Sequence, residues 1–316
     1  MYCDIIFPVN ESEILNEASM QKQFDVRTTG LLVRAPAKIN LVLLVAGKRD
    51  DGYHELETVM AKIDFFDTLL FEPSPGPGVE LLCRGKFELS AGPDNLIHKA
   101  AKAVFGHIGR EIPVRITLNK RIPLGAGLGG GSSDAATTIL GLNEFANLGL
   151  PPETLLQIGA AVGSDVNFFL GGPQALCTGR GERISEIPKI FDFRAILMLP
   201  NQNVSTKMVY ERYVHDAAQY ARQHDRLATY LRRSDLESAA RMAVNMLEPS
   251  CFALHPELKK LKASVESLGL GPVTLSGSGS ALYLLVSALP GQAQRAQSMI
   301  REQIGCECIT VNNNRW

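Results

Sequence analysis

The chain has 316 residues, of which 45% are hydrophobic and 21% are charged, and its formal net charge is -1. This composition is typical of a globular protein with one large or two moderate hydrophobic cores. The balanced charge argues against nucleic acid or a membrane surface as a partner, and apolar runs such as residues 39–46 are too short to span a bilayer.

The first 30 residues lack the basic start and apolar core of a secretory signal and the arginine-rich composition of a transit peptide. They show no periodic pattern, so we expect residues 1–30 to be a mobile N-terminal extension without an assigned function. The scattered cysteines have neither C-x-x-C nor zinc spacing, which predicts reduced thiols in a cytoplasmic protein. These cysteines are Cys3, Cys83, Cys177, Cys251, Cys306 and Cys308.

Residues 31–45 form an almost continuous apolar run, which predicts a buried strand. Lys38 and Asn40 are the polar residues that stand out in it, and their spacing places both side chains on the same face of the strand. A lysine in such a run must either extend its amine to water or contact an anion. The residues alone leave both interpretations open.

A turn signal follows at residues 51–52, and residues 56–63 again resemble a strand, which predicts a hairpin. Tyr53 and His54 lie at the exit of its loop, where such a pair usually has only a structural role. Further strands are expected at residues 67–72 and 79–84. A helix is expected from residue 93 to 105, with Asp94 or Asn95 as its cap.

Residues 121–135 read RIPLGAGLGGGSSDA, with five glycines in seven residues. Alternation in residues 114–119 predicts a strand before this segment, and apolar spacing after it predicts a helix. Ser132 or Ser133 is the expected N-cap, with Asp134 in the first turn, where the helix dipole favours negative charge. Glycines let backbone N–H groups approach a ligand and a helix start offers free donors, so this segment suits a phosphate group. A serine hydroxyl at its end can reach a phosphate oxygen or a magnesium ion.

Three other interpretations of the glycine segment were weighed. A flexible linker is disfavoured, because linkers do not join a strand to an apolar helix. Gly125, Gly127 and Gly130 match the dinucleotide fingerprint G-x-G-x-x-G, but no clear strand with a terminal acid follows the helix. The Walker pattern fails, because no lysine precedes the serines. A phosphate-binding loop of another type remains.

Residues 151–153 start a helix that runs to about residue 162. Asp165 follows, between glycines and an apolar stretch, where a carboxylate needs a partner or becomes protonated; it could also cap a helix or turn. A turn at 177–182, a strand at 195–200 and a helix from 204, capped by Ser205 or Thr206, come next. Helical segments are expected at 235–246 and 256–268. Residues 273–286 predict two strands joined by a glycine turn.

Residues 123–133 resemble the phosphate loop of the GHMP kinases, the superfamily of galactokinase, homoserine kinase, mevalonate kinase and phosphomevalonate kinase. The sequence PAKINL at 36–41 resembles the first motif of that family. GSDVN at 163–167 resembles its Gly-Ala-Asp-Val-Pro motif, with Asn167 in place of proline, and residues 273–286 resemble its third motif. The resemblance implies a two-domain α+β fold: a ribosomal S5 domain 2-like N-terminal domain over 31–190 and a ferredoxin-like C-terminal domain over 191–316.

The resemblance also implies an ATP-dependent kinase that uses Mg²⁺ and phosphorylates a small molecule. Lys38 would lie beside the reacting hydroxyl, and Asp165 would be the catalytic aspartate. Asn95 would lie near the adenine base, and Ser132 and Ser133 are the candidate magnesium contacts. The remaining residues expected at ATP are Pro123, Leu124, Gly125, Ala126, Gly127, Leu128, Gly129, Gly130 and Gly131.

The segment GKRDDGYHE at 47–55 resembles one found in the GHMP kinases of the non-mevalonate isoprenoid pathway, which phosphorylate the 2-hydroxyl of cytidylyl methylerythritol. There the aromatic residue and the histidine cover the cytosine ring, a role that suits stacking. The substrate-binding residues implied are Asn40, Tyr53, His54, Thr206, Tyr210, Gly277, Ser278 and Gly279. The alternatives are a homoserine or mevalonate type of GHMP kinase, a related decarboxylase, or a catalytically inactive nucleotide-binding relative.

Overall fold

Two long antiparallel strands, β2 (Gly30–Lys48) and β3 (His54–Pro73), run through the centre of the molecule. The computed structural model describes residues 22–287 and 289–316. The two strands pair from Leu31 opposite Phe71 to Lys48 opposite His54, with register shifts that bend the ribbon. The predicted hairpin is therefore confirmed, although its strands are much longer than the sequence pattern indicated.

Part of the range that was predicted to be an extension forms a strand. Strand β1 (Phe24–Arg27) lies inside the range predicted to be an extension, and it pairs with the start of β2. Its pairing partner lies in the next few residues of the chain, so a short hairpin forms without any apolar periodicity. The part of that extension before residue 22 lies outside the described residues.

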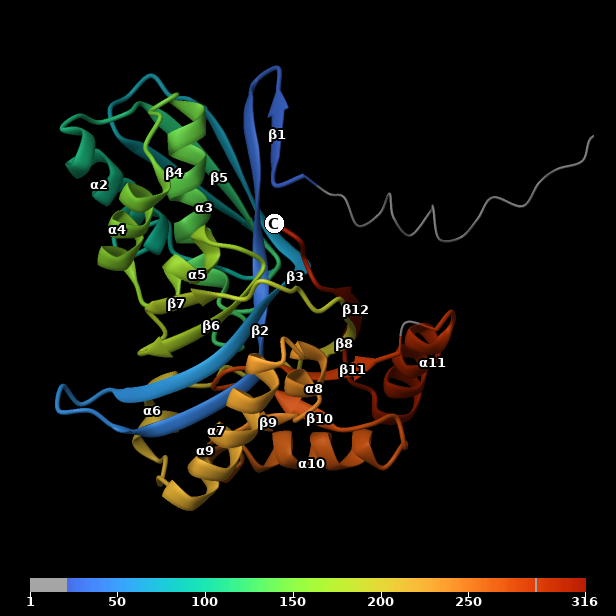
Figure 1. Cartoon of the computed structure of the whole chain (residues 1–316). Helices are drawn as coiled ribbons and strands as arrows, with labels where there is room; N and C mark the ends of the chain where they lie inside the picture. Colours follow the sequence, from blue (N-terminus) through green and yellow to red (C-terminus); the bar gives the residue numbers. More distant parts are fainter. Residues whose placement is uncertain (1–21, 288) are drawn as a thin grey trace, which may run out of the picture.

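An eight-stranded sheet and a layer of helices form the N-terminal part (Figure 1). β3 pairs with β5 (Val114–Lys120), and β5 pairs with β4 (Val79–Gly85); β6 (Gln174–Gly179) and β7 (Arg183–Glu186) continue the sheet from the other half of β3. The helices are α2 (Leu96–Ile108), α3 (Gly130–Phe145), α4 (Pro152–Val162) and α5 (Val166–Leu170). Val33, Phe71, Ile116 and Ile139 belong to the core between these layers.

The C-terminal part contains a four-stranded antiparallel sheet in the order β10-β11-β8-β12. Its strands are β8 (Arg194–Met198), β10 (Val273–Leu275), β11 (Leu282–Val286) and β12 (Cys308–Asn312). Numbered along the chain, the spatial order is 4-1-3-2, and helical segments form both crossovers. This is the ferredoxin-like arrangement that the resemblance implied. The glycine turn between β10 and β11 is also as predicted.

Between β8 and β10 the chain is mostly helical. The elements are α6 (Thr206–Glu211), α7 (Ala217–Arg232), α8 (Leu236–Ala240), β9 (Val244–Asn245), α9 (Glu248–Leu254) and α10 (Pro256–Glu266). After β11 follow α11 (Gln292–Met299) and a π-helical turn, η1 (Ile300–Ile304). The predicted helix over 235–246 is wrong beyond residue 240, because Val244 pairs with Val42 of β2. Helix α7 was not predicted.

The two parts share β2 instead of a linker. The first half of this strand packs in the N-terminal core, whereas residues such as Leu41 and Leu43 belong to the same core as Leu197 and Leu282 of the C-terminal sheet. The border of the two cores therefore crosses the strand that carries Lys38 and Asn40. Among the described residues, none of the helices combines the length and the apolar character that a membrane crossing requires.

Candidate active site

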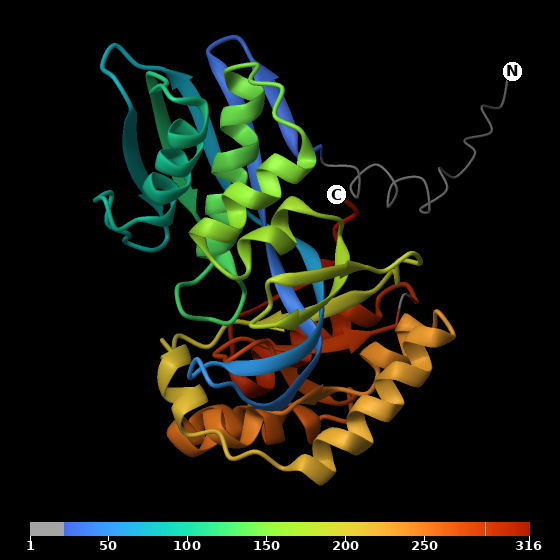
Figure 2. The same cartoon turned by 60° about the vertical axis from the view of Figure 1, so that its left-hand side comes forward.

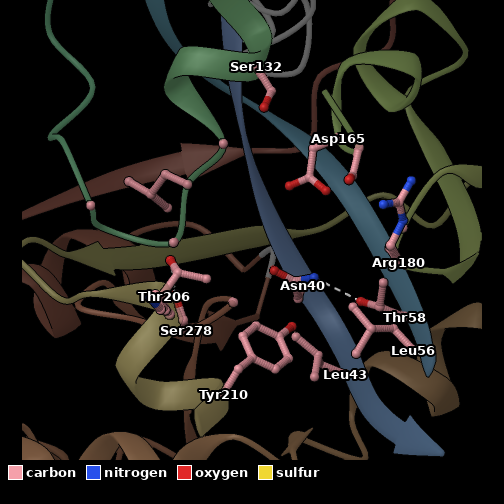
Figure 3. A pocket seen from close by; sticks show the side chains of 18 of the residues that line it. Asn40, Leu43, Leu56, Thr58, Ser132, Asp165, Arg180, Thr206, Tyr210 and Ser278 are labelled. Carbon is pink, nitrogen blue, oxygen red and sulfur yellow. Dashed lines mark hydrogen bonds between the residues drawn. The ribbon is translucent and has the colours of Figure 1, made fainter. Parts of the chain in front are cut away.

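A cavity of about 940 Å³ lies where the two parts meet. β2, β3, the glycine loop, the start of α5, α6 and the turn after β10 all contribute to its wall, and Figure 3 shows side chains from these segments around one space. The candidate site residues in its lining are Lys38, Asn40, Tyr53, His54, Pro123, Leu124, Gly125, Ala126, Gly127, Leu128, Gly129, Gly130, Gly131, Ser132, Asp165, Thr206, Tyr210, Gly277 and Ser278. Asn95, Ser133 and Gly279 lie outside this lining.

The middle carbonyl groups of the glycine loop are held by hydrogen bonds from other segments. The carbonyls of residues 125 to 128 accept hydrogen bonds from the N–H groups of Val204, Ala281 and Lys38 and from two side chains. These contacts occupy the loop carbonyls, and the loop backbone lines the cavity. The positive φ of 61° to 73° at Gly125, Gly127 and Gly129 suits an anion site, because alternating left-handed residues form a concave anion nest.

Helix α3 begins three to four residues earlier than the sequence suggested. Gly129, in the left-handed conformation, occupies the N-cap position, so the prediction of Ser132 or Ser133 as N-cap is wrong. The reason is that glycine alone enters this backbone conformation without a steric penalty. The shift turns Ser133 inward, where it is fully buried and its hydroxyl lacks a hydrogen-bond partner in the described residues. Ser132, in contrast, lines the cavity (Figure 3).

Lys38 is buried and faces the glycine loop. Its Nζ donates hydrogen bonds to Asn40 Oδ1 at 2.5 Å and to the Gly127 carbonyl at 2.8 Å. Asn40 Nδ2 in turn donates to Thr58 Oγ1 at 2.8 Å, so a polar network inside the sheet fixes the amine (Figure 3). Burial lowers the pKa of Lys38, and the negative charge of Asp165 opposes this shift.

Asp165 precedes α5 and faces the cavity (Figure 3). It occupies the N-cap position, but its side chain makes no capping hydrogen bond, which leaves the carboxylate available to a ligand. Burial raises the pKa of Tyr210, and the charge of Asp165 adds to that shift. The charge of Asp165 therefore affects the pKa of both Lys38 and Tyr210.

Helix α5, which begins after Asp165, is held at its other end by a second buried lysine. Lys62 Nζ donates to the carbonyls of Phe169 at 3.1 Å and Gly171 at 2.8 Å. Burial lowers the pKa of Lys62 to about 7. Since a cation at a helix C-terminus binds otherwise unpaired carbonyls, Lys62 fixes the short helix that presents Asp165.

The tip of the β2–β3 hairpin meets α6 in a cluster of rings. The His54 ring lies 5.2 Å from that of Tyr210 and 5.6 Å from that of Tyr213, and the latter pair is edge-to-face. Figure 2 shows the tip of the β2–β3 hairpin beside the segment that contains α6. The Arg180 guanidinium lies 4.9 Å from the centre of the Tyr53 ring. Burial lowers the pKa of His54, with contributions from Lys48 and His215, so its imidazole is neutral near pH 7.

Two further candidate residues, Thr206 and Asn95, make hydrogen bonds within the protein near the cavity. Thr206 Oγ1 and Ser278 Oγ lie 2.8 Å apart and join α6 to the turn after β10. Asn95 caps α2: its Oδ1 accepts from the Ile97 N–H and its Nδ2 donates to the Ser90 carbonyl. Its side chain is thus used by the helix start, and the neighbouring Leu96 faces the cavity instead.

Sequence reasoning did not assign several residues of the lining. Tyr213, Thr58 and Lys48 belong to it, and they come from segments whose pairing was not known. Arg180 lies in the turn predicted at 177–182, to which the sequence assigned no role. Its contact with Tyr53 depends on the fold and could not be read from the sequence. Its positive charge in a glycine turn was the only local signal.

Comparison with known proteins identifies the class. Residues 95–174 match the GHMP kinases N terminal domain, and residues 227–305 match the GHMP kinases C terminal family. The chain belongs to the GHMP kinases.

More particular similarity points to one branch of that family. The chain is 40% identical over 264 residues to the 4-diphosphocytidyl-2-C-methyl-D-erythritol kinase of Bacillus cereus. The matched region covers 81% of this chain and 88% of that protein. A crystal structure of 4-(cytidine 5'-diphospho)-2C-methyl-D-erythritol kinase matches with a TM-score of 0.70 and 32% identity, over 90% of this chain and 100% of that one. A homoserine kinase from Cytophaga hutchinsonii matches with a TM-score of 0.72 over 93% and 98% of the two chains. Its identity of 18% indicates a shared fold alone.

Proposed function

We propose that this protein transfers the γ-phosphate of ATP to the 2-hydroxyl group of 4-diphosphocytidyl-2-C-methyl-D-erythritol. One observation carries the proposal. A single cavity contains an amide-lined loop, a lysine and an aspartate, and the ring cluster around His54. These three features correspond to a triphosphate, a reacting hydroxyl and a pyrimidine.

The glycine loop is the proposed site of the ATP phosphates. Its backbone amides and the start of α3 can provide donors and partial positive charge for an anion. Magnesium ions bind hard oxygen ligands and are commonly held by phosphates together with one or two protein oxygens. The Ser132 hydroxyl, in the cavity wall, offers such an oxygen, whereas the buried Ser133 does not face the cavity. Bound magnesium would neutralise charge on the transferred phosphate.

Asp165 and Lys38 are the proposed catalytic residues. The hydroxyl oxygen attacks the γ-phosphorus, the bond between this phosphorus and the β–γ bridging oxygen breaks, and ADP leaves with that electron pair. The proton of the hydroxyl passes to the Asp165 carboxylate. The Lys38 ammonium, fixed by Asn40 and the loop carbonyl, stabilises negative charge on the attacking oxygen.

The ring cluster is the proposed cytidine site. Tyr53, His54 and Tyr210 offer flat faces for a base. A neutral imidazole can both donate and accept a hydrogen bond, so His54 can also bind the polar edge of cytosine. Arg180 and Lys48 line the same end of the cavity, where they can bind the diphosphate of this substrate.

A coupled ADP-release assay tests the proposal. Purified protein with Mg²⁺ and ATP is offered the cytidylyl compound, homoserine or mevalonate. Rapid ADP release with the cytidylyl compound alone is expected. Release with homoserine or mevalonate in its place would refute the substrate assignment, and no release with any of the three would favour an inactive nucleotide-binding relative.

A further inference from the structure

A buried ion cluster lies behind the glycine loop, outside the cavity wall. Lys120 is the last residue of β5, Asp67 belongs to β3, and Asp134 belongs to α3. Lys120 Nζ lies 2.5 Å from Asp67 Oδ2 and 2.6 Å from Asp134 Oδ2. All three residues are at most 2% exposed. The main contact of Asp134 is therefore with Lys120, and not with the helix dipole as the sequence predicted.

The cluster contacts both ends of the glycine loop. Lys120 immediately precedes the loop, and Asp134 lies in the helix that follows it. The second oxygen of Asp67 accepts hydrogen bonds from the N–H groups of Arg121 at 2.5 Å and Ile122 at 2.9 Å. A single ammonium thus joins the strand before the loop to the helix after it, and one carboxylate holds the first two loop amides.

The packing at the start of α3 depends on the same ammonium. A Cβ added to Gly130 would lie only 2.9 Å from Lys120 Nζ. The first residue of the helix therefore rests directly on the amine, and only glycine allows this approach without displacement. Ile122 Cγ2 would lie at the same 2.9 Å from this Cβ, so the amine and an apolar side chain together pack against the helix start.

We infer that Lys120, Asp67 and Asp134 are positioning residues that hold the two ends of the glycine loop at the separation needed to bind the phosphates of ATP. The loop itself consists largely of glycine and has little intrinsic preference for one shape. A buried ion cluster is weak support for stability as such, because desolvation offsets most of the attraction. Its contacts are directed instead at the backbone that forms the phosphate site.

The inference rests on the proposed binding of ATP at this loop, and two variants test it. Asp134→Asn keeps the shape of the side chain and replaces one carboxyl oxygen with an amide nitrogen, and Lys120→Met removes the ammonium. We expect ATP affinity and kcat/KM for ATP to fall by at least about tenfold, as displacement of a binding group by about 1 Å produces. The KM for the cytidylyl substrate should remain near the wild-type value, because its proposed site is formed by other elements.

The matched control is Lys86→Met, which makes the same chemical change in an exposed pair with Glu307. Calorimetry with ATP and Mg²⁺ measures binding, and circular dichroism reports whether each variant is folded. Folded Asp134→Asn or Lys120→Met protein with wild-type ATP affinity would overturn the inference. Loss of folding in both variants would also overturn it, because the cluster would then act on global stability. If wild-type protein binds ATP but does not phosphorylate the cytidylyl compound, the substrate assignment is wrong, but the effect of these variants on ATP binding can still be measured.

Discussion

The buried amine of Lys62 should make the stability of this protein depend on pH above neutrality. The change to test is Lys62→Met, which keeps an unbranched apolar stem and removes the amine. Lys62 is 1% exposed and donates to two carbonyls, and no ion pair to it occurs in residues 22–287 and 289–316. Burial lowers its pKa from 10.5 to about 7 in the folded chain.

The sign and size of the effect follow from proton binding. Below the folded pKa of about 7, both the folded and the unfolded chain carry the proton on Lys62. Between that value and 10.5, only the unfolded chain retains it, so the free energy of unfolding rises with pH. The slope that one such group contributes is about 1.4 kcal/mol per pH unit. Above the unfolded pKa, neither state carries the proton and the contribution becomes constant.

Urea unfolding, followed by circular dichroism at several pH values between about 7.5 and 9, measures this slope. The other titrating groups are common to both proteins, so their contributions cancel in the difference between wild type and Lys62→Met. That difference should move in favour of the wild type as pH rises. An exposed Lys86→Met control should show no such trend. Parallel pH curves for wild type and Lys62→Met would refute the reasoning, because Lys62 would then titrate alike in both states.

Three further predictions concern the proposed site. Asp165→Asn should lower kcat by about 100-fold or more and leave ATP affinity, measured by calorimetry, largely unchanged; wild-type turnover would rule out the proposed proton acceptor. His54→Ala should weaken binding of the cytidylyl substrate by about 1–3 kcal/mol with little change in the KM for ATP. Equal effects on both substrates would contradict the cytosine assignment. Gly127→Ala should destabilise the fold by more than the roughly 1–2 kcal/mol of a left-handed alanine, because its Cβ would lie 1.9 Å from the Ser276 carbonyl oxygen. Gly149→Ala, also at positive φ but without a neighbour within 4 Å, is the control in urea unfolding and should show the backbone effect alone.

The elements that the sequence predicted correctly are those with a local signal. The alternation before residue 120, the glycine run after it and the Asp51-Gly52 turn each depend on neighbours in the chain, and β5, the loop and the β2–β3 hairpin follow from them. Lys38 was marked by its chemistry, since an amine in an apolar strand requires a partner. The structure supplies Asn40 and a loop carbonyl in that role.

Contacts between distant segments had no such signal. Residues 244–245 continue an apolar helical pattern, but they pair with β2, about 200 residues earlier, and tertiary pairing overrides the local preference. Ser133 was placed in the site because it follows the glycines, and the helix start at Gly130 turns it inward. The partnership of Asp134 with Lys120 could not be read from spacing, because its geometry depends on the shape of the loop between them.

The strand shared by both cores limits how this protein can move. Because β2 is hydrogen-bonded to β3 along almost its whole length and is buried in both cores, we expect the two parts to rotate little relative to each other. The cavity is therefore reached from its outer border, where the hairpin tip at residues 49–53 and the start of α6 are largely exposed. We expect substrates to enter and products to leave across this exposed border.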